Sequence, residues 1–210
     1  ETDRRGDVGS WCRIEAMRVL TDGLMASHPR VANNFMNEGD SFCIKVVAGM
    51  LKQMSEKLDT VRKVSAECLQ LLLRHKTLPI PYKQEMLEKV FFLENGTYVL
   101  KPAFFPVLME VAALNSIYFT NIIRGTVLSL AGLSESLAKV SQRALNVNKT
   151  DRDADWSRKL FTLLSTTIRL RDRALTVPSL KTIKLLLDHG MLKTSSLPRT
   201  WMDETVELLN

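Results

Sequence analysis

Residues 2–13 read Thr2-Asp3-Arg4-Arg5-Gly6-Asp7-Val8-Gly9-Ser10-Trp11-Cys12-Arg13 and contain the clearest helix start in the chain. Asp7 suits the N-cap position, because a short carboxylate accepts hydrogen bonds from the first free amides and carries the charge that the helix dipole favours there. From Val8 onward apolar residues recur at helical spacing, leaving a narrow polar stripe of Glu15, Arg18 and Asp22. We therefore predict a helix that is covered on more than one side.

The pattern of this helix returns further along the chain. In both places an aspartate opens the helix and an arginine stands seven residues before a leucine: Asp7, Arg13 and Leu20, then Asp59, Arg62 and Leu69. The offset between the two arginines is 49 residues. The pattern resembles the second helix of HEAT units, which stack paired helices with a period of ~40–47 residues. We expect structural roles at the two helix starts for Asp7, Trp11, Arg13, Asp59 and Arg62.

Predicted helices follow one another along the whole sequence, and no segment shows sustained alternation of polar and apolar residues. The first runs from Val8 to before His28, the second follows a cap at Asp40 or Ser41, and the third runs from about Glu56 to before Leu78. Caps, prolines and glycines place the others at about 82–92, 105–114, 117–131, 134–147, 156–173, 177–190 and 200–209. Pro106 and Pro178 are expected in first turns, because proline has no amide proton to donate, and Asn115 is expected to break the helical pattern before the helix at 117. We predict an all-α fold, a HEAT/armadillo-like helical-repeat solenoid of about ten helices.

The composition is that of a folded globular protein with a moderate positive charge. Of the 210 residues 45% are hydrophobic and 25% are charged, and the formal net charge is +6. We expect a single helical-repeat domain over 1–210, with sub-blocks of about 1–101 and 102–210. The chain begins with Glu1 rather than methionine, so we interpret it as a fragment of a longer chain. No run approaches the ~20 apolar residues of a membrane span.

Patterns typical of catalysis, metal binding or cofactor binding are missing from the sequence. The three histidines lie near predicted helix ends, where the helix dipole favours them, and have no set of ligands at metal-binding spacing. Gly125 and Gly132 lack the surroundings of a phosphate loop and are interpreted as helix punctuation. The cysteines, Cys12, Cys43 and Cys68, are each expected on the apolar side of a helix, as small hydrophobes rather than disulfide partners or metal ligands. We predict that the chain is no enzyme and has no catalytic residue, metal or cofactor.

The helix predicted at about 156–173 is basic and amphipathic. On a helical wheel Arg158, Arg169 and Arg173 share one face, opposite Leu160 and Leu164. We predict that these arginines bind a partner, and a solvated repeat face is the plainer alternative. For the whole chain the alternative is a generic helical-repeat adaptor whose basic face binds nucleic acid or an anionic membrane surface. Aromatic residues for base stacking are not interleaved with the basic ones, which argues against nucleic acid.

Four segments of the sequence also resemble a known family in the same order. They are Asp3 to Trp11 with Arg13, Ala16, Met17 and Leu20; Ser55 to Asp59 with Leu78 to Pro81 and Leu87 to Lys89; Leu128 to Ser136; and Val177 to Thr182 with His189 and Gly190. Together they resemble the C-terminal domain of tubulin-folding cofactor D, a chaperone of the αβ-tubulin heterodimer. The resemblance covers roughly residues 1–192.

The resemblance implies a chaperone that recognises protein surfaces and carries out no covalent chemistry. Its expected partners are β-tubulin and the αβ-tubulin heterodimer, the tubulin cofactors E and C, and a small Arf-like GTPase. With these it would assemble and disassemble the heterodimer and take part in control of the GTPase cycle. The expected location is the cytoplasm and the microtubule cytoskeleton.

Overall fold

A computed structural model describes residues 2–3, 6–26, 42–90, 97–100, 103–130, 135–146, 154–170 and 173–188. The chain divides into two compact units, Glu1–Leu145 and Asn146–Asn210. The division lies well after the boundary expected at about 101/102, because the helices that follow residue 102 pack onto those that precede it.

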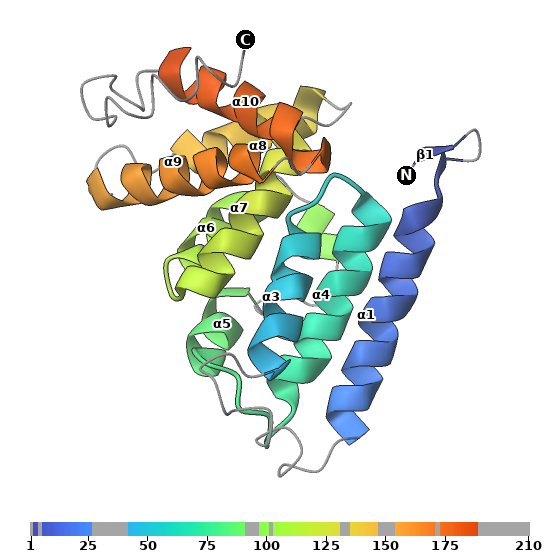
Figure 1. The fold of residues 1–210 in the computed structure, drawn as a ribbon. Coiled ribbons are helices and arrows are strands. Elements are labelled where there is room, and N and C mark those ends of the chain that lie inside the picture. Colours follow the sequence, from blue (N-terminus) through green and yellow to red (C-terminus); the bar gives the residue numbers. More distant parts are fainter. Residues whose placement is uncertain are drawn as a thin grey trace. The chain divides into compact units, whose positions relative to one another are not determined.

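The all-α, helical-repeat class is confirmed over the described residues, which contain nine α-helices (Figure 1). Most of them begin in the first unit: α1 (Val8–Ala26), α3 (Phe42–Met54), α4 (Asp59–Arg74), α5 (Lys83–Val90), α6 (Phe104–Ala112), α7 (Ser116–Leu130) and α8 (Glu135–Asn146), with a 3-10 helix η1 (Thr97–Leu100). The second unit contains α9 (Ala154–Arg169) and α10 (Arg173–Asp188). Two short strands, β1 (Thr2–Asp3) and β2 (Gly6–Asp7), pair antiparallel just before α1. The helix predicted at 200–209 lies outside the described residues.

Local signals placed the middle of the chain well. Pro106 lies in the first turn of α6, as predicted from its missing amide proton. The helix predicted at 117–131 is α7, which begins at Ser116 and ends at Leu130. Asn115 caps it, since its Oδ1 accepts a hydrogen bond from the Ile117 amide at 2.7 Å.

Two boundaries near the C-terminal end were predicted wrongly. The helix expected at 156–173 is α9, which ends at Arg169, and α10 begins at Arg173 rather than at Val177. Pro178 was expected in the first turn but lies inside α10. Its ring removes one regular backbone hydrogen bond from the second turn of this helix.

Helix α3 is the centre of the first unit. It packs against α4 on one side and α7 on another, while α6 covers α7. Its sequence explains this position, because apolar residues occupy most of its circumference and such a helix must be covered on several sides. The buried residues are Cys43, Val46, Val47, Ala48, Met50, Leu51 and Met54. Each fully buried Leu or Met side chain contributes roughly 1.5–3 kcal/mol to folding.

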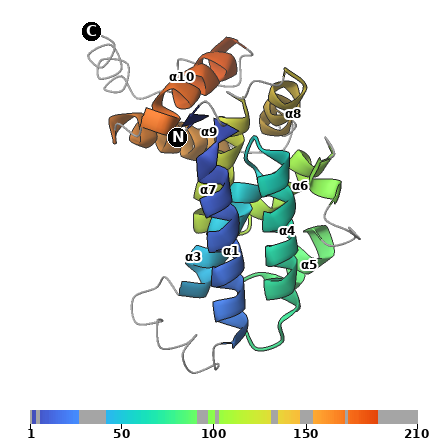
Figure 2. The same ribbon diagram turned by 90° about the vertical axis from the view of Figure 1, so that its right-hand side faces the viewer.

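Helices α1 and α4, the two copies of the aspartate–arginine pattern, pack against each other (Figure 2). This is the arrangement of equivalent helices in successive repeats, where each helix stacks on its counterpart in the next unit. The repeat interpretation of the pattern therefore agrees with the packing.

The prediction that α1 is covered on more than one side is wrong. Its buried residues form one stripe, consisting of Ser10, Met17, Thr21 and Leu24. Trp11 is 73% exposed and Val19 is 68% exposed, although both are large and apolar. α1 packs mainly on α4, so one stripe is enough for its contact and the rest of its apolar surface remains accessible.

The second unit is built on the packing of α9 against α10. The buried side chains of α9 include Leu160, Phe161 and Leu164, and those of α10 include Ile183 and Leu186. None of the helices that the structure describes has the length and apolar character needed to cross a bilayer.

Candidate partner-binding site

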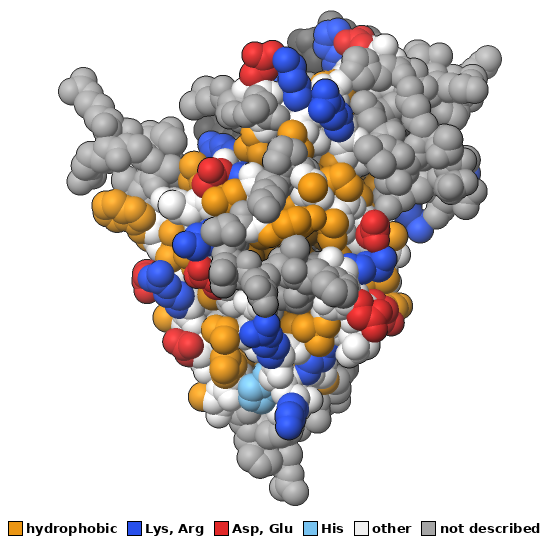
Figure 3. Space-filling model, turned by 180° about the vertical axis from the view of Figure 1, so that it is seen from behind, with side chains coloured by type: hydrophobic (Ala, Val, Ile, Leu, Met, Phe, Trp, Pro, Cys, Tyr) orange, Lys and Arg blue, Asp and Glu red, His pale blue; other side chains and the backbone are white. Residues whose placement is uncertain are grey.

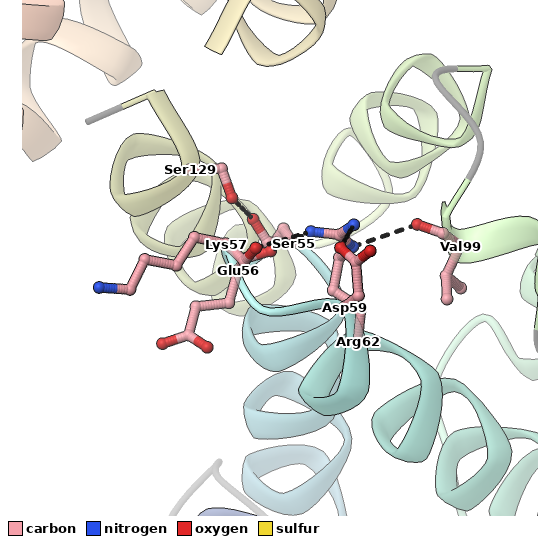
Figure 4. Close-up of polar contacts among 7 residues, drawn as sticks. All are labelled: Ser55, Glu56, Lys57, Asp59, Arg62, Val99 and Ser129. Atoms are coloured by element: carbon pink, nitrogen blue, oxygen red, sulfur yellow. Dashed lines mark hydrogen bonds and ion pairs between the residues drawn. The ribbon is translucent and has the colours of Figure 1, made fainter. Parts of the chain in front are cut away.

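The turn between α3 and α4 carries a polar network that joins several elements of the first unit (Figure 4). Arg62, on the first turn of α4, points back into this turn. Its Nη1 donates to the carbonyl oxygens of Glu56 at 2.8 Å and of Lys57 at 3.2 Å. Its Nε donates to the carbonyl oxygen of Val99 in η1 at 3.2 Å, and Nη2 pairs with Asp59. Arg62 therefore joins α4 to a segment 37 residues away.

The role of Arg62 is structural. The residue is only 3% exposed, and burial lowers the pKa of its guanidinium, while the carboxylates of Asp59 and Glu56 act in the opposite direction. Its donors face the carbonyl oxygens of Glu56, Lys57 and Val99 and satisfy these acceptors. Asp59 is the first residue of α4 and holds the guanidinium rather than capping the helix.

Glu56 connects this network to α1. Its carboxylate points away from Arg62 in Figure 4 and lies 3.4 Å from Nη2 of Arg13. The Glu56 side chain is 6% exposed and that of Arg13 is 31% exposed, so the ion pair is shielded from water on the acidic side. The two arginines of the repeated pattern thus contact the same residue, one at its side chain and the other at its backbone.

Ser55 and Gly125 allow α3 and α7 to approach closely. The hydroxyl of Ser55 donates to the carbonyl oxygen of Ile122 at 3.2 Å, and the hydroxyl of Ser129 donates to the carbonyl oxygen of Ser55 at 2.7 Å. A methyl group on Gly125 would overlap the carbonyl oxygen of Lys52 and the Ser55 hydroxyl. Gly125 lies inside α7, so its interpretation as helix punctuation was wrong.

The other residues expected at the start of α1 behave differently from Arg13. Asp7 directly precedes the helix, which fits an N-cap position, but its side chain lies outside the described part of the structure. Trp11 is on the helix surface and contributes little to the core, since it is the most exposed of the large apolar residues described.

The three arginines predicted to bind a partner do not share one helix. Arg158 is exposed on α9, Arg169 is the last residue of α9, and Arg173 is the first residue of α10. Ser165 of α9 is 7% exposed and donates to the Phe161 carbonyl oxygen at 2.9 Å. The prediction that the three arginines form one continuous basic face of a single helix is therefore wrong. Of the three, Arg158 has a side chain that the structure describes.

Cysteines and histidines give no sign of chemistry in the described residues. Cys43 and Cys68 are buried, as expected for the apolar side of a helix, whereas Cys12 is exposed, contrary to that expectation. Burial raises the pKa of the Cys43 thiol to about 11 and raises the pKa of Cys68. His75 ends α4, and His28 and His189 lie outside the described residues. Within the described ranges no group of three His, Cys, Asp or Glu side chains could hold a metal ion.

Charges of both signs are mixed over the face shown in Figure 3. Lysine and arginine side chains alternate there with aspartate and glutamate and with hydrophobic patches. Several of the described charges are paired along helices, among them Arg18 with Glu15 at 2.6 Å and Lys139 with Glu135 at 2.6 Å. The face seen in this view is therefore not the uniformly basic surface that a nucleic-acid-binding adaptor would present.

Sequence reasoning missed Ser55, Glu56, Val99 and Ser129, the partners in the two networks. A local signal existed for the serines, because small residues on apolar helices favour close helix approach. No signal existed for Val99, which contributes only its backbone carbonyl.

The sequence matches the family model described as "Tubulin folding cofactor D C terminal" over residues 44–210. The match includes most of the first unit and all of the second, and it begins after the N-terminal segment that contains Asp7, Trp11 and Arg13. No solved structure gives a significant match to the chain.

Proposed function

Because the chain belongs to the tubulin folding cofactor D C-terminal family, we propose that it is the part of this tubulin-folding chaperone that recognises tubulin, and that it binds β-tubulin and the αβ-tubulin heterodimer. The observation that carries the proposal is the family match, which extends over residues 44–210. The helical-repeat fold supports it, since stacked helices offer extended surfaces for protein recognition.

In the proposed cycle the chain acts with the tubulin cofactors E and C and with a small Arf-like GTPase. Together they assemble and disassemble the heterodimer in the cytoplasm, at the microtubule cytoskeleton, and control its GTPase activity. The chain itself contributes binding surfaces and no catalytic group. The purified chain should accordingly neither bind nor hydrolyse GTP, and turnover that survives repurification would contradict this part of the proposal.

Arg158, Arg169 and Arg173 are proposed as contacts that steer tubulin, which is acidic, toward the second unit. Arg158 is exposed on α9, and the other two lie at the end of α9 and the start of α10. Exposed charges act mainly on the association rate, and their effect is screened over ~8 Å at physiological ionic strength.

The first experiment is a pull-down of soluble tubulin by the purified chain. Tubulin whose acidic tails have been removed serves as a parallel sample. Capture of intact tubulin supports the proposal, and weaker capture of the tailless sample would identify the acidic tails as part of the contact. If neither sample is retained at micromolar concentrations, this chain is not the tubulin-binding part.

The second experiment tests the arginines by reversing all three to glutamate and measuring tubulin association at low and high salt. A control variant carries Lys63→Glu, Arg74→Glu and Lys76→Glu, which lie on or next to α4 and are exposed. Each triple reversal lowers the formal net charge from +6 to 0, since every replacement removes two charges. We expect slower association at low salt for the arginine variant alone, with the difference shrinking at high salt. Equal slowing of both variants would show that only net charge matters.

A further inference from the structure

A groove lies between α1 and α3, and we call it the α1/α3 groove. It has a volume of about 350 Å³ and is open to solvent along one side. Its lining residues are Arg13, Ala16, Met17 and Leu20 of α1, and Phe42, Lys45, Val46, Gly49, Met50 and Gln53 of α3. It exists because both helices pack on α4 while touching each other only lightly.

The floor and walls of the groove are apolar. Met17, Val46 and Met50 are buried at 5%, 6% and 1% exposure and form its floor, while Leu20 and Phe42 remain 36% and 40% exposed. Methionines fill space adaptably and recur in surfaces that receive helices. Gly49 leaves a hollow, since a Cβ built on it meets nothing within 4 Å.

The spacing of the lining residues fits an elongated occupant. On each helix they recur every three or four residues, so they form one strip along α1 and one along α3. The two helices run in opposite directions (Figures 1 and 2), which places the Arg13 end of one strip beside the Gln53 end of the other. A groove bordered by two such strips is the usual receptor for an amphipathic helix, which inserts side chains at positions i, i+3, i+4 and i+7.

The charged residues that line the groove indicate which charges the bound helix should carry. Two lining residues are charged, and both are basic: Arg13 near one end and Lys45 toward the other. Arg13 keeps its ion pair with the buried Glu56, and this pair holds the guanidinium in place. Lys45 lies eight residues before Gln53 on α3, so the two basic groups are about 12 Å apart along the groove at 1.5 Å per residue. Acidic residues seven or eight positions apart on a bound helix would match this separation.

We propose that the α1/α3 groove binds an amphipathic helix of a partner protein, which inserts an apolar face between α1 and α3 and pairs acidic residues two turns apart with Arg13 and Lys45. This site lies in the first unit, separate from the arginines of α9 and α10, and does not depend on them. The groove is the receptor and the partner supplies the helix.

The test uses a fluorescently labelled helical peptide of 18 residues. Its leucines repeat at i, i+4, i+7 and i+11 and form one apolar stripe along the helix. Two glutamates, seven residues apart, lie along one side of this stripe. A second peptide replaces both glutamates by lysine and is otherwise identical. We expect anisotropy measurements to show saturable binding of the acidic peptide and at least tenfold weaker binding of the lysine peptide.

Two glycines provide matched variants. Gly49→Leu fills the groove, whereas Gly23→Leu adds the same side chain to α1 outside the groove, and neither position has an atom within 4 Å of a new Cβ. Gly49→Leu should abolish peptide binding while circular dichroism and the melting temperature show an intact fold. Gly23→Leu should bind as the unchanged chain does. Lys45→Glu should reduce or reverse the preference for the acidic peptide.

Several results would overturn the proposal. The acidic peptide could fail to bind, the two peptides could bind equally, or Gly49→Leu could leave binding unchanged. Uptake of a small apolar dye without any peptide binding would assign the groove to small ligands instead. A dimer in light scattering that Gly49→Leu converts to monomer would assign it to a second copy of the chain.

Discussion

The side chain of Arg62 donates a hydrogen bond to the backbone carbonyl of Glu56 at 2.8 Å from a position that is 3% exposed. A cation this well buried is retained only because carbonyl oxygens and a carboxylate surround it. Removing it would leave the carbonyl oxygens of Glu56, Lys57 and Val99 without their donor.

Arg62→Met should therefore destabilise the first unit by about 2–6 kcal/mol, since two buried acceptors, the carbonyl oxygens of Glu56 and Val99, lose this donor and each such loss costs roughly 1–3 kcal/mol. Urea unfolding followed by circular dichroism measures the change. Arg18→Met is the control, because Arg18 is exposed and pairs with Glu15 three residues away on the same helix. That control should change the stability by no more than about 0.5 kcal/mol. Equal losses in both variants would remove the structural role assigned to Arg62.

Gly125→Ala and Gly49→Ala should have effects of opposite sign, although both replace a glycine inside a helix. Alanine at Gly125 collides with the carbonyl oxygen of Lys52, so α7 must move away from α3 at a cost of about 1–3 kcal/mol. Alanine at Gly49 meets open space and gains up to about 1 kcal/mol from helix propensity. Melting temperatures of the two variants provide the measurement. A gain for both would mean that α3 and α7 are not in close contact in solution.

Cysteine reactivity should separate Cys12 from the other two cysteines. Cys12 is exposed, whereas Cys43 and Cys68 are buried and their thiol pKa values are raised, which reduces the reactive thiolate. Iodoacetamide at pH 8 should label Cys12 within minutes and the other two only after unfolding. Mass spectrometry of tryptic peptides measures this. Rapid labelling of Cys43 in the native chain would mean that α3 is not at the centre of the unit.

Stability should fall as the pH rises above about 9. A cysteine thiol in the unfolded chain has an ordinary pKa of 9.0, whereas burial raises the pKa of Cys43 to about 11 in the folded chain, so between these values the unfolded state loses a proton that the folded state keeps. The contribution of Cys43 is fully present below pH 9 and is lost as the pH rises through 11, with a slope of up to about 1.4 kcal/mol per pH unit. Burial also raises the pKa of Tyr118, whose hydroxyl donates to the Pro81 carbonyl oxygen at 3.1 Å, and this adds a loss of the same sign above pH 10.

Unfolding by urea at pH 8, 9 and 10 measures the slope, and Cys43→Ala serves as the comparison. The variant should have a lower free energy of unfolding than the unchanged chain at pH 8, but this free energy should fall less between pH 8 and pH 10. An equal fall for the two chains would show that Cys43 does not titrate in this way.

The sequence predicted a helix end correctly where a residue with a strong local preference, such as proline or a capping asparagine, lies at that end. Pro106 and Asn115 fixed α6 and the start of α7, because their effects act within one turn. Between Arg169 and Arg173 the sequence contains neither proline nor glycine, so the break between α9 and α10 had no such marker and the three arginines were assigned to one helix.

Contacts between distant segments were less accessible from the sequence. The repeated pattern predicted a structural role for Arg62, but its acceptor on Val99 is a backbone atom whose presence depends on the fold. The apolar character of α1 was correctly read, yet its exposure was not, since composition does not say how many neighbours a helix has. The α1/α3 groove arises in the same way, from two helices that share α4 as a neighbour without filling the space between themselves.

The short turn that contains Ser55 and Glu56 contacts three helices of the first unit. Glu56 holds α1 through its carboxylate and α4 through its carbonyl oxygen, while Ser55 holds α7. A displacement of α1 therefore reaches this turn through the side chains of Arg13 and Glu56, whereas the bonds from the turn to α4 and α7 end on its backbone oxygens. A partner that displaced α1 would thus act on residues that also contact α4 and α7.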